Sequence, residues 1–186
     1  MHPRRAVVSV WDKTGVVDFA RVLRDTGHQV LSTSKTAQLI RAADVPVTEI
    51  SDYTGSPEIL GGRVKTLHPL IAGGILTTRK DDTVPPIDIV VCNLYPFEEG
   101  LARGLAHPEL VELIDIGGVT LLRAAAKNHD HVTVVPGPEH YGPVADELRA
   151  RGAVGPELRR ELARRAFELT SGYDAAIARH FAGLGG

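Results

Sequence analysis

The stretch AVVSVWDKTGVVDFARVLRDTGHQVLST, residues 6–33, decides the fold, because it alternates a strand pattern with a helix pattern. The short apolar run at residues 6–10 is typical of a buried strand. Apolar residues from Val16 to Leu23 then recur with the spacing of one helix face, and Gly27 follows as a stop signal. A second strand pattern begins at residue 29. This order predicts a parallel sheet with right-handed helical crossovers.

The same alternation continues and predicts a three-layer α/β fold with a mainly parallel central sheet, formed by residues 1–186 as a single domain. The run IDIVVCN, residues 87–93, is apolar enough to be a central strand. Further strands are expected at residues 45–50, 75–76 and 132–135. Further helices are expected at residues 36–43, after Ser56-Pro57-Glu58, and at 98–104, 108–114, 119–127, 141–150 and 156–180, with an exposed loop at 80–86.

The overall composition is that of an ordinary globular chain, with 186 residues, 43% hydrophobic and 24% charged. The formal net charge of −2 provides no global basic field for nucleic acid, so any anion site must be local. Cys92 is the lone cysteine, which rules out an intramolecular disulfide and fits a reducing compartment. Every apolar run is shorter than the roughly 18 residues of a membrane span. We therefore expect a cytoplasmic protein with neither nucleic-acid nor membrane partners.

Polar residues gather at four places where the pattern puts strand ends or loops. They are Ser9 with Asp12-Lys13, then Ser32-Thr33-Ser34-Lys35-Thr36, then Arg63 to His68, and finally Asn93-Leu94-Tyr95 with Asp115 to Gly118 and Lys127. Ligands of open α/β sheets bind at the carboxyl ends of strands, so these residues are candidates for a binding site. The alternatives are an N-cap for the Ser/Thr run and a favourable helix-end cation for Lys127.

The segment GGRVKTLHP, residues 61–69, concentrates anion-binding chemistry behind a glycine pair. Arg63 can hold an anion bidentately, and Lys65 adds a point charge. In an extended segment, Arg63, Lys65 and Leu67 would share one side. The arrangement suits a phosphorylated small molecule, although an ordinary basic loop has the same composition.

The segment around Asp115 also contains groups suited to anion binding and catalysis. Gly117-Gly118, placed immediately before a helix, leaves backbone N–H groups for an anion or an oxyanion. Asp115 itself is expected at the end of the preceding helix, near the negative end of its dipole, where a carboxylate is mildly unfavourable. Cys92 lies in an apolar strand and is expected to be an inert core residue. Neither metal-ligand spacing nor a nucleotide-cofactor motif occurs, so we expect no metal and no cofactor.

Several motifs occur together in one order. They are Ser9-Val10 with Asp12-Lys13-Thr14-Gly15, VTEISDYTG at 47–55, GRVKTLHP at 62–69, NLYPF at 93–97, IDIGG at 114–118 and LRAAAKNH at 122–129. With these motifs the chain resembles the IMP cyclohydrolase (inosinicase) domain, the N-terminal half of the bifunctional purine-biosynthesis protein that also carries AICAR transformylase. The resemblance covers about residues 7–181, nearly the whole chain.

The resemblance implies a methylglyoxal-synthase-like fold, a homodimer and a cofactor-free ring closure. The reaction joins the formyl carbon of 5-formamidoimidazole-4-carboxamide ribotide (FAICAR) to the carboxamide nitrogen, with loss of water, and gives IMP. By this resemblance Asp115 is the candidate base, and Lys65, Tyr95 and Lys127 are the other catalytic side chains, donors to the developing oxyanion. The substrate-binding residues that it implies are Ser9, Lys13, Thr33, Ser34, Lys35, Thr36, Arg63, Thr66, Asn93, Leu94, Ile116, Gly117 and Gly118.

Three departures from the family pattern bear on the substrate. Trp11 stands where most relatives have serine or tyrosine, and Ser34-Lys35 replaces a glycine pair in the family's phosphate turn. Losing both glycines restricts the backbone around a phosphate, while Lys35 adds a cation. The chain also lacks the transformylase half, as expected of either a fragment or a stand-alone cyclohydrolase acting on FAICAR or on a purine-like analogue.

Two other functions are compatible with the same fold. A phosphate-eliminating lyase like methylglyoxal synthase is one, but the Asp-Ile-Gly-Gly and Asn-Leu-Tyr-Pro motifs are not those of that enzyme. A nucleotide-binding regulatory module is the other, and it would bind IMP or AMP without turnover. Ring closure is the leading hypothesis, because every catalytic side chain that the resemblance implies is retained.

Overall fold

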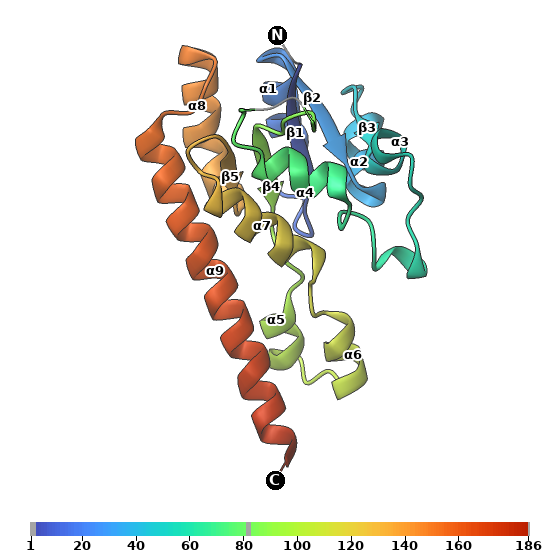
Figure 1. Cartoon of the computed structure of the whole chain (residues 1–186). Helices are drawn as coiled ribbons and strands as arrows, with labels where there is room; N and C mark the ends of the chain where they lie inside the picture. Colours follow the sequence, from blue (N-terminus) through green and yellow to red (C-terminus); the bar gives the residue numbers. More distant parts are fainter. Residues whose placement is uncertain (1–2, 81–82, 186) are drawn as a thin grey trace.

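The computed structural model describes residues 3–80 and 83–185. Its centre is a five-stranded sheet in the order β3-β2-β1-β4-β5, and each pair of neighbouring strands is parallel (Figure 1). The strands are β1 (Arg4–Ser9), β2 (His28–Ser32), β3 (Thr48–Glu49), β4 (Ile89–Cys92) and β5 (Thr133–Val135). The predicted α/β class and the parallel sheet are confirmed.

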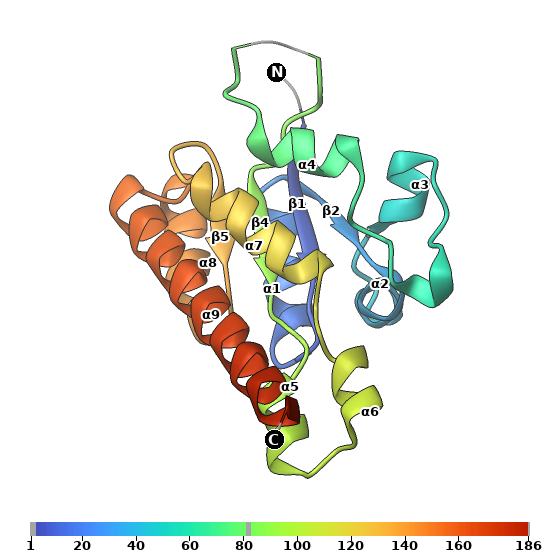
Figure 2. The same ribbon diagram turned by 60° about the horizontal axis from the view of Figure 1, so that its bottom comes forward.

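Helices cover both faces of this sheet. They are α1 (Val16–Asp25), α2 (Ser34–Ala42), α3 (Ile50–Thr54), α4 (Pro69–Leu76), α5 (Phe97–Ala102), α6 (His107–Glu112), α7 (Gly117–Lys127), α8 (Tyr141–Arg151) and α9 (Pro156–Ala182), with short 3-10 turns at Leu60–Gly62, Pro138–His140 and Gly183–Gly185. Figures 1 and 2 show α4 and α7 on one face and α1 on the other, while α9 runs along α7 and β5.

The main core lies on both faces of the two central strands. Val7 and Val8 of β1 and Val90 and Val91 of β4 are all fully buried. A strand covered by helices on both faces needs a continuous apolar run rather than an alternating one. The central residues of β1 and β4 accordingly form apolar runs without polar interruptions. The pattern at residues 45–50 shortens to two paired residues in β3, because the chain enters α3 at Ile50.

The segment between β3 and α4 differs from the sequence prediction. The helix expected after Ser56 is absent, and the short helix α3 lies before it and ends at Gly55, whose φ of 71° only glycine adopts at low cost. Ile59 then forms an antiparallel bridge with Val64. A 3-10 turn at Leu60–Gly62 joins them, and residues 65–66 form a bend, so the stretch from Arg63 to Leu67 is not an extended segment with one common side.

The strand predicted at residues 75–76 is also wrong, because these residues close α4. Ile71 and Ile75 are fully buried and lie four residues apart, on one helical face. A short apolar run does not distinguish a strand from a buried helix end. The loop expected at residues 80–86 includes Asp81 and Asp82, which lie outside the described residues.

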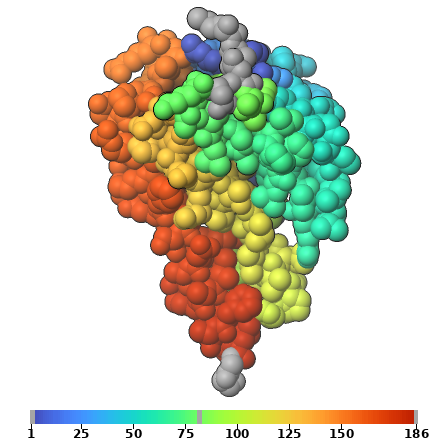
Figure 3. Space-filling model, in the orientation of Figure 1, coloured from blue at the N-terminus to red at the C-terminus, as the bar shows by residue number. Residues whose placement is uncertain are grey.

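A smaller lobe extends from the sheet body and is formed by α5, α6 and the C-terminal half of α9 (Figures 1 and 3). It has a core of its own around Phe97, Leu110 and Tyr173. The helix α9 is 27 residues long, about 40 Å, and so reaches from the sheet to the tip of the lobe. Among the described helices, α9 included, none is both long and apolar enough to cross a membrane.

Candidate active site

The carboxyl ends of β1, β2 and β4 meet at one edge of the sheet. From the central strand β1 the chain passes to β2 and β3 on one side, and later to β4 and β5 on the other. The register sets Ser9 beside Cys92, so the loop after β1 lies next to Asn93. Ligands of open α/β sheets bind in the crevice where strand order reverses. The first, second and fourth predicted clusters therefore meet at this edge, apart from Lys127, and we call the region that they border the crevice.

One side of the crevice is suited to an anion. The hydroxyl oxygens of Ser9 and Thr33, which follow neighbouring strands, lie 3.4 Å apart. Ser34 begins α2, where backbone N–H groups point outward. Thr36, in contrast, is buried and donates its hydroxyl proton to the carbonyl oxygen of Val10 at 3.3 Å. In this structure it stabilises the turn, and its predicted role in substrate binding stays a prediction.

Three lysines lie close together at the same side. Burial lowers the pKa of Lys13, and the nearby charges of Lys35 and Lys65 lower it further. The ammonium group of Lys13 folds back to donate to the carbonyl oxygens of Val10 and Trp11. A bound dianion would relieve the repulsion among these cations, and the predicted role of Lys35 as an added cation stays a prediction.

Glu58 is a residue of this site that the sequence reasoning missed. Its carboxylate accepts a hydrogen bond from the hydroxyl of Ser34. A Cβ atom built on Gly62 would lie 2.8 Å from Cε of Lys65 and 3.4 Å from Oε2 of Glu58, so both side chains flank Gly62. A carboxylate therefore lies among the groups expected to bind phosphate. The sequence offered only a helix-start signal at Glu58, and no helix forms there.

Asp115 is held firmly at the other side of the crevice. Its Oδ1 accepts the N–H of Gly118 at 2.6 Å, and its own N–H donates to the Tyr173 hydroxyl at 2.9 Å. The Tyr173 hydroxyl in turn donates to the carbonyl oxygen of Leu113. Burial raises the pKa of Asp115, although the N–H groups of Gly118 and Tyr95 and the charge of Lys65 oppose that rise.

This geometry corrects two predictions about the segment. The preceding helix, α6, already ends at Glu112, so Asp115 lies at the positive N-terminal end of α7 rather than at a negative helix end. The amide of Gly118 is already bonded to Asp115, and it is therefore not an open donor for an oxyanion. Gly117 instead packs against Thr66, whose Oγ1 would lie 2.7 Å from a Cβ at that position.

Tyr95 lies beside Asp115 in the same crevice. Burial raises the pKa of Tyr95, and the negative charges of Asp115 and Glu58 raise it further. The phenol therefore stays protonated at neutral pH and can donate a hydrogen bond. Cys92 is fully buried and its pKa is raised well above the usual value, so the prediction of an inert core thiol agrees with its environment.

Two predicted residues are not brought to this cluster within one copy of the chain. Lys127 is exposed at the C-terminal end of the 11-residue α7, about 15 Å along the helix from Gly117. Arg63 points to the lobe and forms an exposed ion pair with Glu112. Of the remaining predicted contacts, Leu94 is half-buried between the two cores, and Ile116 is 59% exposed at the start of α7. Across residues 3–80 and 83–185, we find no group of three metal-ligating side chains.

Comparison with known families shows the class of protein to which the chain belongs. Residues 15–120 match the MGS-like domain family, and residues 125–185 match the AICARFT/IMPCHase bienzyme family. The chain belongs to the MGS-like domain family.

Individual relatives narrow this assignment. The chain is 48% identical, over 94% of its length, to the bifunctional purine biosynthesis protein PurH of Persephonella marina. It is 53% identical, over 97% of its length, to PurH of Rhodospirillum rubrum. The chain spans 36% of each of these relatives. The crystal structure of ForH matches with a TM-score of 0.81 and 35% identity, and covers 96% of this chain and 99% of ForH.

Proposed function

We propose that the protein is an IMP cyclohydrolase, which closes the pyrimidine ring of FAICAR, or of a close purine-like analogue, and releases water. The observation that carries this proposal is the half-buried Asp115, a carboxylate fixed by the N–H of Gly118 near the charge of Lys65 and the backbone N–H of Tyr95, with a raised pKa that suits a general base. The similarity to PurH proteins over nearly the whole chain supports the same reaction. Residues 1–186 act in this proposal as one functional domain.

In the proposed mechanism the substrate phosphate binds among Lys13, Lys35 and the Ser34 hydroxyl. The heterocycle then extends toward Asp115, with its two reacting groups held in the rotamer that brings them together. The carboxamide nitrogen attacks the formyl carbon and loses a proton to Asp115. Lys65 and Tyr95 donate hydrogen bonds to the formyl oxygen as it becomes negative. That oxygen takes up the proton held by Asp115 and a second proton from the formamido nitrogen, and it leaves as water while the C=N bond of the new ring forms.

An absorbance assay with FAICAR tests this proposal. The purified protein should form IMP at the same rate with and without a chelator, and Asp115→Asn should lower kcat by on the order of 100-fold. Asp146→Asn is a matched control, because Asp146 is exposed on α8 and forms an exposed ion pair with Arg149. Tight IMP binding with no turnover of FAICAR or its analogues would favour the regulatory module instead.

We propose further that the protein binds a nucleotide as a homodimer in the cytoplasm, without a nucleic-acid or membrane partner. The family resemblance supports the dimer, and the net charge of −2 supports the lack of a nucleic-acid partner. A two-fold contact through α7 would run the two copies of that helix antiparallel and bring each Lys127 near the other copy's crevice. This arrangement reconciles the predicted catalytic role of Lys127 with its exposed position.

Mixing two inactive variants tests the shared site. Asp115→Asn and Lys127→Met dimers that exchange subunits should regain about a quarter of wild-type activity, because half the dimers are mixed and each has one intact site. Light scattering gives the oligomeric state in the same samples. No recovery in samples shown to exchange subunits would exclude a shared site.

A further inference from the structure

Trp11 lies on the loop between β1 and α1, which is fixed to the end of β4. The backbone N–H groups of Trp11 and Asp12 both donate to Oδ1 of Asn93, at 2.6 and 3.0 Å. Nδ2 of Asn93 donates back to the carbonyl oxygen of Asp12 at 3.0 Å. The side-chain amide of Asn93 thus acts as a clamp on the loop. It fixes the backbone of Trp11, from which the indole extends.

Trp11 contacts residues on both sides of the crevice, one through its backbone and one through its indole. On the anion side, the ammonium of Lys13 donates to the Trp11 carbonyl oxygen at 3.1 Å. On the reaction side, the indole contacts the ring of Tyr95 edge to face, with centroids 5.0 Å apart and an interplanar angle of 80°. Trp11 therefore contacts both a lysine expected to bind phosphate and the tyrosine beside Asp115.

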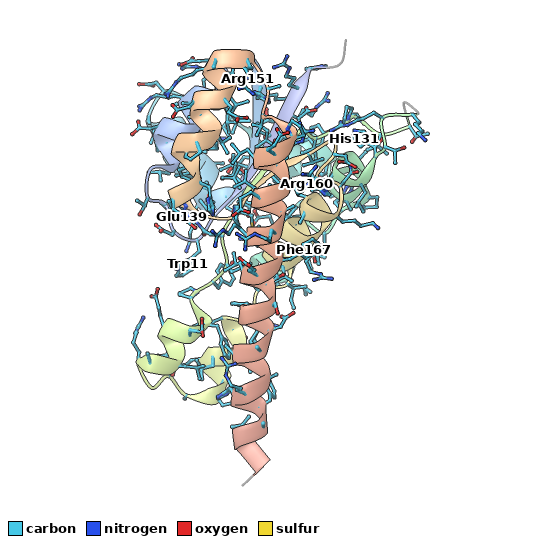
Figure 4. All side chains as sticks on the ribbon, turned by 90° about the vertical axis from the view of Figure 1, so that its left-hand side faces the viewer. Trp11, His131, Glu139, Arg151, Arg160 and Phe167 are labelled. Atoms are coloured by element: carbon cyan, nitrogen blue, oxygen red, sulfur yellow. The ribbon has the colours of Figure 1, made fainter. Side chains whose placement is uncertain are left out.

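Much of this large side chain is uncovered, since Trp11 is 49% exposed. Figure 4 shows it at the edge of the sheet body, above the lobe and away from Phe167 on α9. Aromatic rings stack readily on the flat face of a nucleobase. The Trp11 backbone is fixed, Tyr95 supports one side of the indole, and the rest of the indole is open. Such an indole offers a stacking platform.

We propose that Trp11 is a specificity-determining residue, whose open indole surface packs on the planar heterocycle of the bound substrate and excludes water from it. The inference rests on the proposed function for the identity of the ligand, a phosphorylated nucleoside-like molecule. Packing on the ring limits its tilt and holds the carboxamide close to Asp115. A serine at this position would offer no such surface.

The first test uses the fluorescence of Trp11, which is the single tryptophan of the chain. Saturating IMP should change the emission and protect Trp11 from quenching by acrylamide several-fold. Inorganic phosphate fills only the anion side and should leave quenching unchanged. Unaltered quenching in an IMP-saturated sample, with binding verified by calorimetry, would overturn the proposal. Protection by IMP in a protein that does not turn over FAICAR would support the stacking role and contradict the proposed reaction.

The second test uses variants. Trp11→Ser should raise KM and the Kd for IMP about tenfold, as expected for the loss of one ring-stacking contact, whereas Trp11→Phe should retain most of the affinity. Phe167→Ser is the matched control, because Phe167 is a 39% exposed aromatic on α9, beside Arg123. It should leave KM and Kd unchanged. Wild-type KM and Kd in folded Trp11→Ser would also overturn the proposal.

Discussion

At the scale of single residues, the crevice combines ionisable groups whose pKa values are shifted from their ordinary values by their surroundings. Asp115 is half-buried, and the desolvation raises its pKa, so it is a stronger base than a surface carboxylate, while Tyr95 beside it is a weaker acid than usual. Lys13 has a lowered pKa among other lysines. Such shifts destabilise the empty protein and favour a ligand that supplies the missing charge or accepts the proton.

The stability of the Asp115→Asn variant should reflect the free-energy cost of keeping a charged carboxylate at this site in the native protein. A carboxyl group whose folded pKa lies above its unfolded pKa binds its proton more tightly in the native state, so native stability falls as pH rises between the two values. Above that window the wild type carries the full penalty, which the neutral amide of asparagine does not. We expect urea unfolding at pH 7 to show Asp115→Asn at least as stable as the wild type, and the difference to shrink below the window.

The control for this experiment is Asp146→Asn, whose carboxylate is exposed. It should change the stability little at any pH. A variant at Asp115 that is clearly less stable than the wild type at pH 7 would show that the hydrogen bond from Gly118 outweighs the burial of the charge.

Glu58 should oppose the binding of phosphate. Its carboxylate accepts the hydrogen bond from Ser34 and lies near Lys65, so a phosphate dianion must displace it or approach a like charge. We expect Glu58→Gln to bind IMP about threefold to tenfold more tightly, with the largest effect at low salt. Isothermal titration at two ionic strengths measures this change.

Glu112→Gln is the matched control for Glu58, because Glu112 is an exposed carboxylate that contacts the same loop through Arg63. It should alter IMP affinity much less, since exposed ion pairs contribute little. Weaker binding in Glu58→Gln would mean that this carboxylate orients the lysines rather than competing with the substrate.

At the scale of elements, the site depends on loops that are tied to the ends of central strands. The Asn93 amide fixes the β1–α1 loop, and the N-terminus of α7 fixes Asp115. The strand and helix alternation around these loops follows from apolar periodicity and was predictable. The tie at Asn93 was not, because it joins residues about 80 positions apart and depends on which strands are neighbours.

Asn93→Ala should loosen the loop without unfolding the sheet. The N–H groups of Trp11 and Asp12 lose their acceptor but can reach water, so we expect a loss of about 1 kcal/mol in the free energy of unfolding. Trp11 fluorescence anisotropy should fall, and IMP affinity should fall with it. Gln29→Ala, which removes an exposed hydrogen bond to Thr48, should leave both unchanged. Unchanged anisotropy in Asn93→Ala would remove the clamp role.

At the scale of the whole molecule, the lobe connects to the chemistry through Tyr173. This tyrosine belongs to the core of the lobe, yet its hydroxyl accepts the N–H of Asp115 and donates to Leu113. Long α9 carries Tyr173 and spans both parts of the molecule. The packing of the lobe therefore bears on the position of the base.

Leu110→Ala should test this coupling. Leu110 is 2% exposed in the lobe core, so the truncation should cost about 2–4 kcal/mol and increase amide exchange across α5 and α6. We expect kcat to fall as well. Leu148→Ala is the matched control, because Leu148 is equally buried but lies in the main core on α8. It should cost similar stability with kcat unchanged in the folded enzyme, and an equal kcat in both variants would separate the lobe from catalysis.

How much could be predicted from the sequence also differs with scale. The sheet, its parallel strands and the family followed from long periodic segments and ordered motifs. The errors fall between β3 and α4 and at Asp115, where elements are too short for periodicity or where glycine geometry decides the path. Glu58 could not be found because its partners, Ser34 and Lys65, meet it only in the folded chain.

The pH dependence of kcat/KM for FAICAR tests the central claim, that Asp115 is the base for ring closure, most directly. The wild-type rate should fall toward acid with an apparent pKa above the ordinary value for aspartate, about 3.9, because burial raises the pKa of Asp115. In Asp115→Asn the rate should be on the order of 100-fold lower and this acid limb should disappear. An unchanged acid limb in the variant would contradict the account.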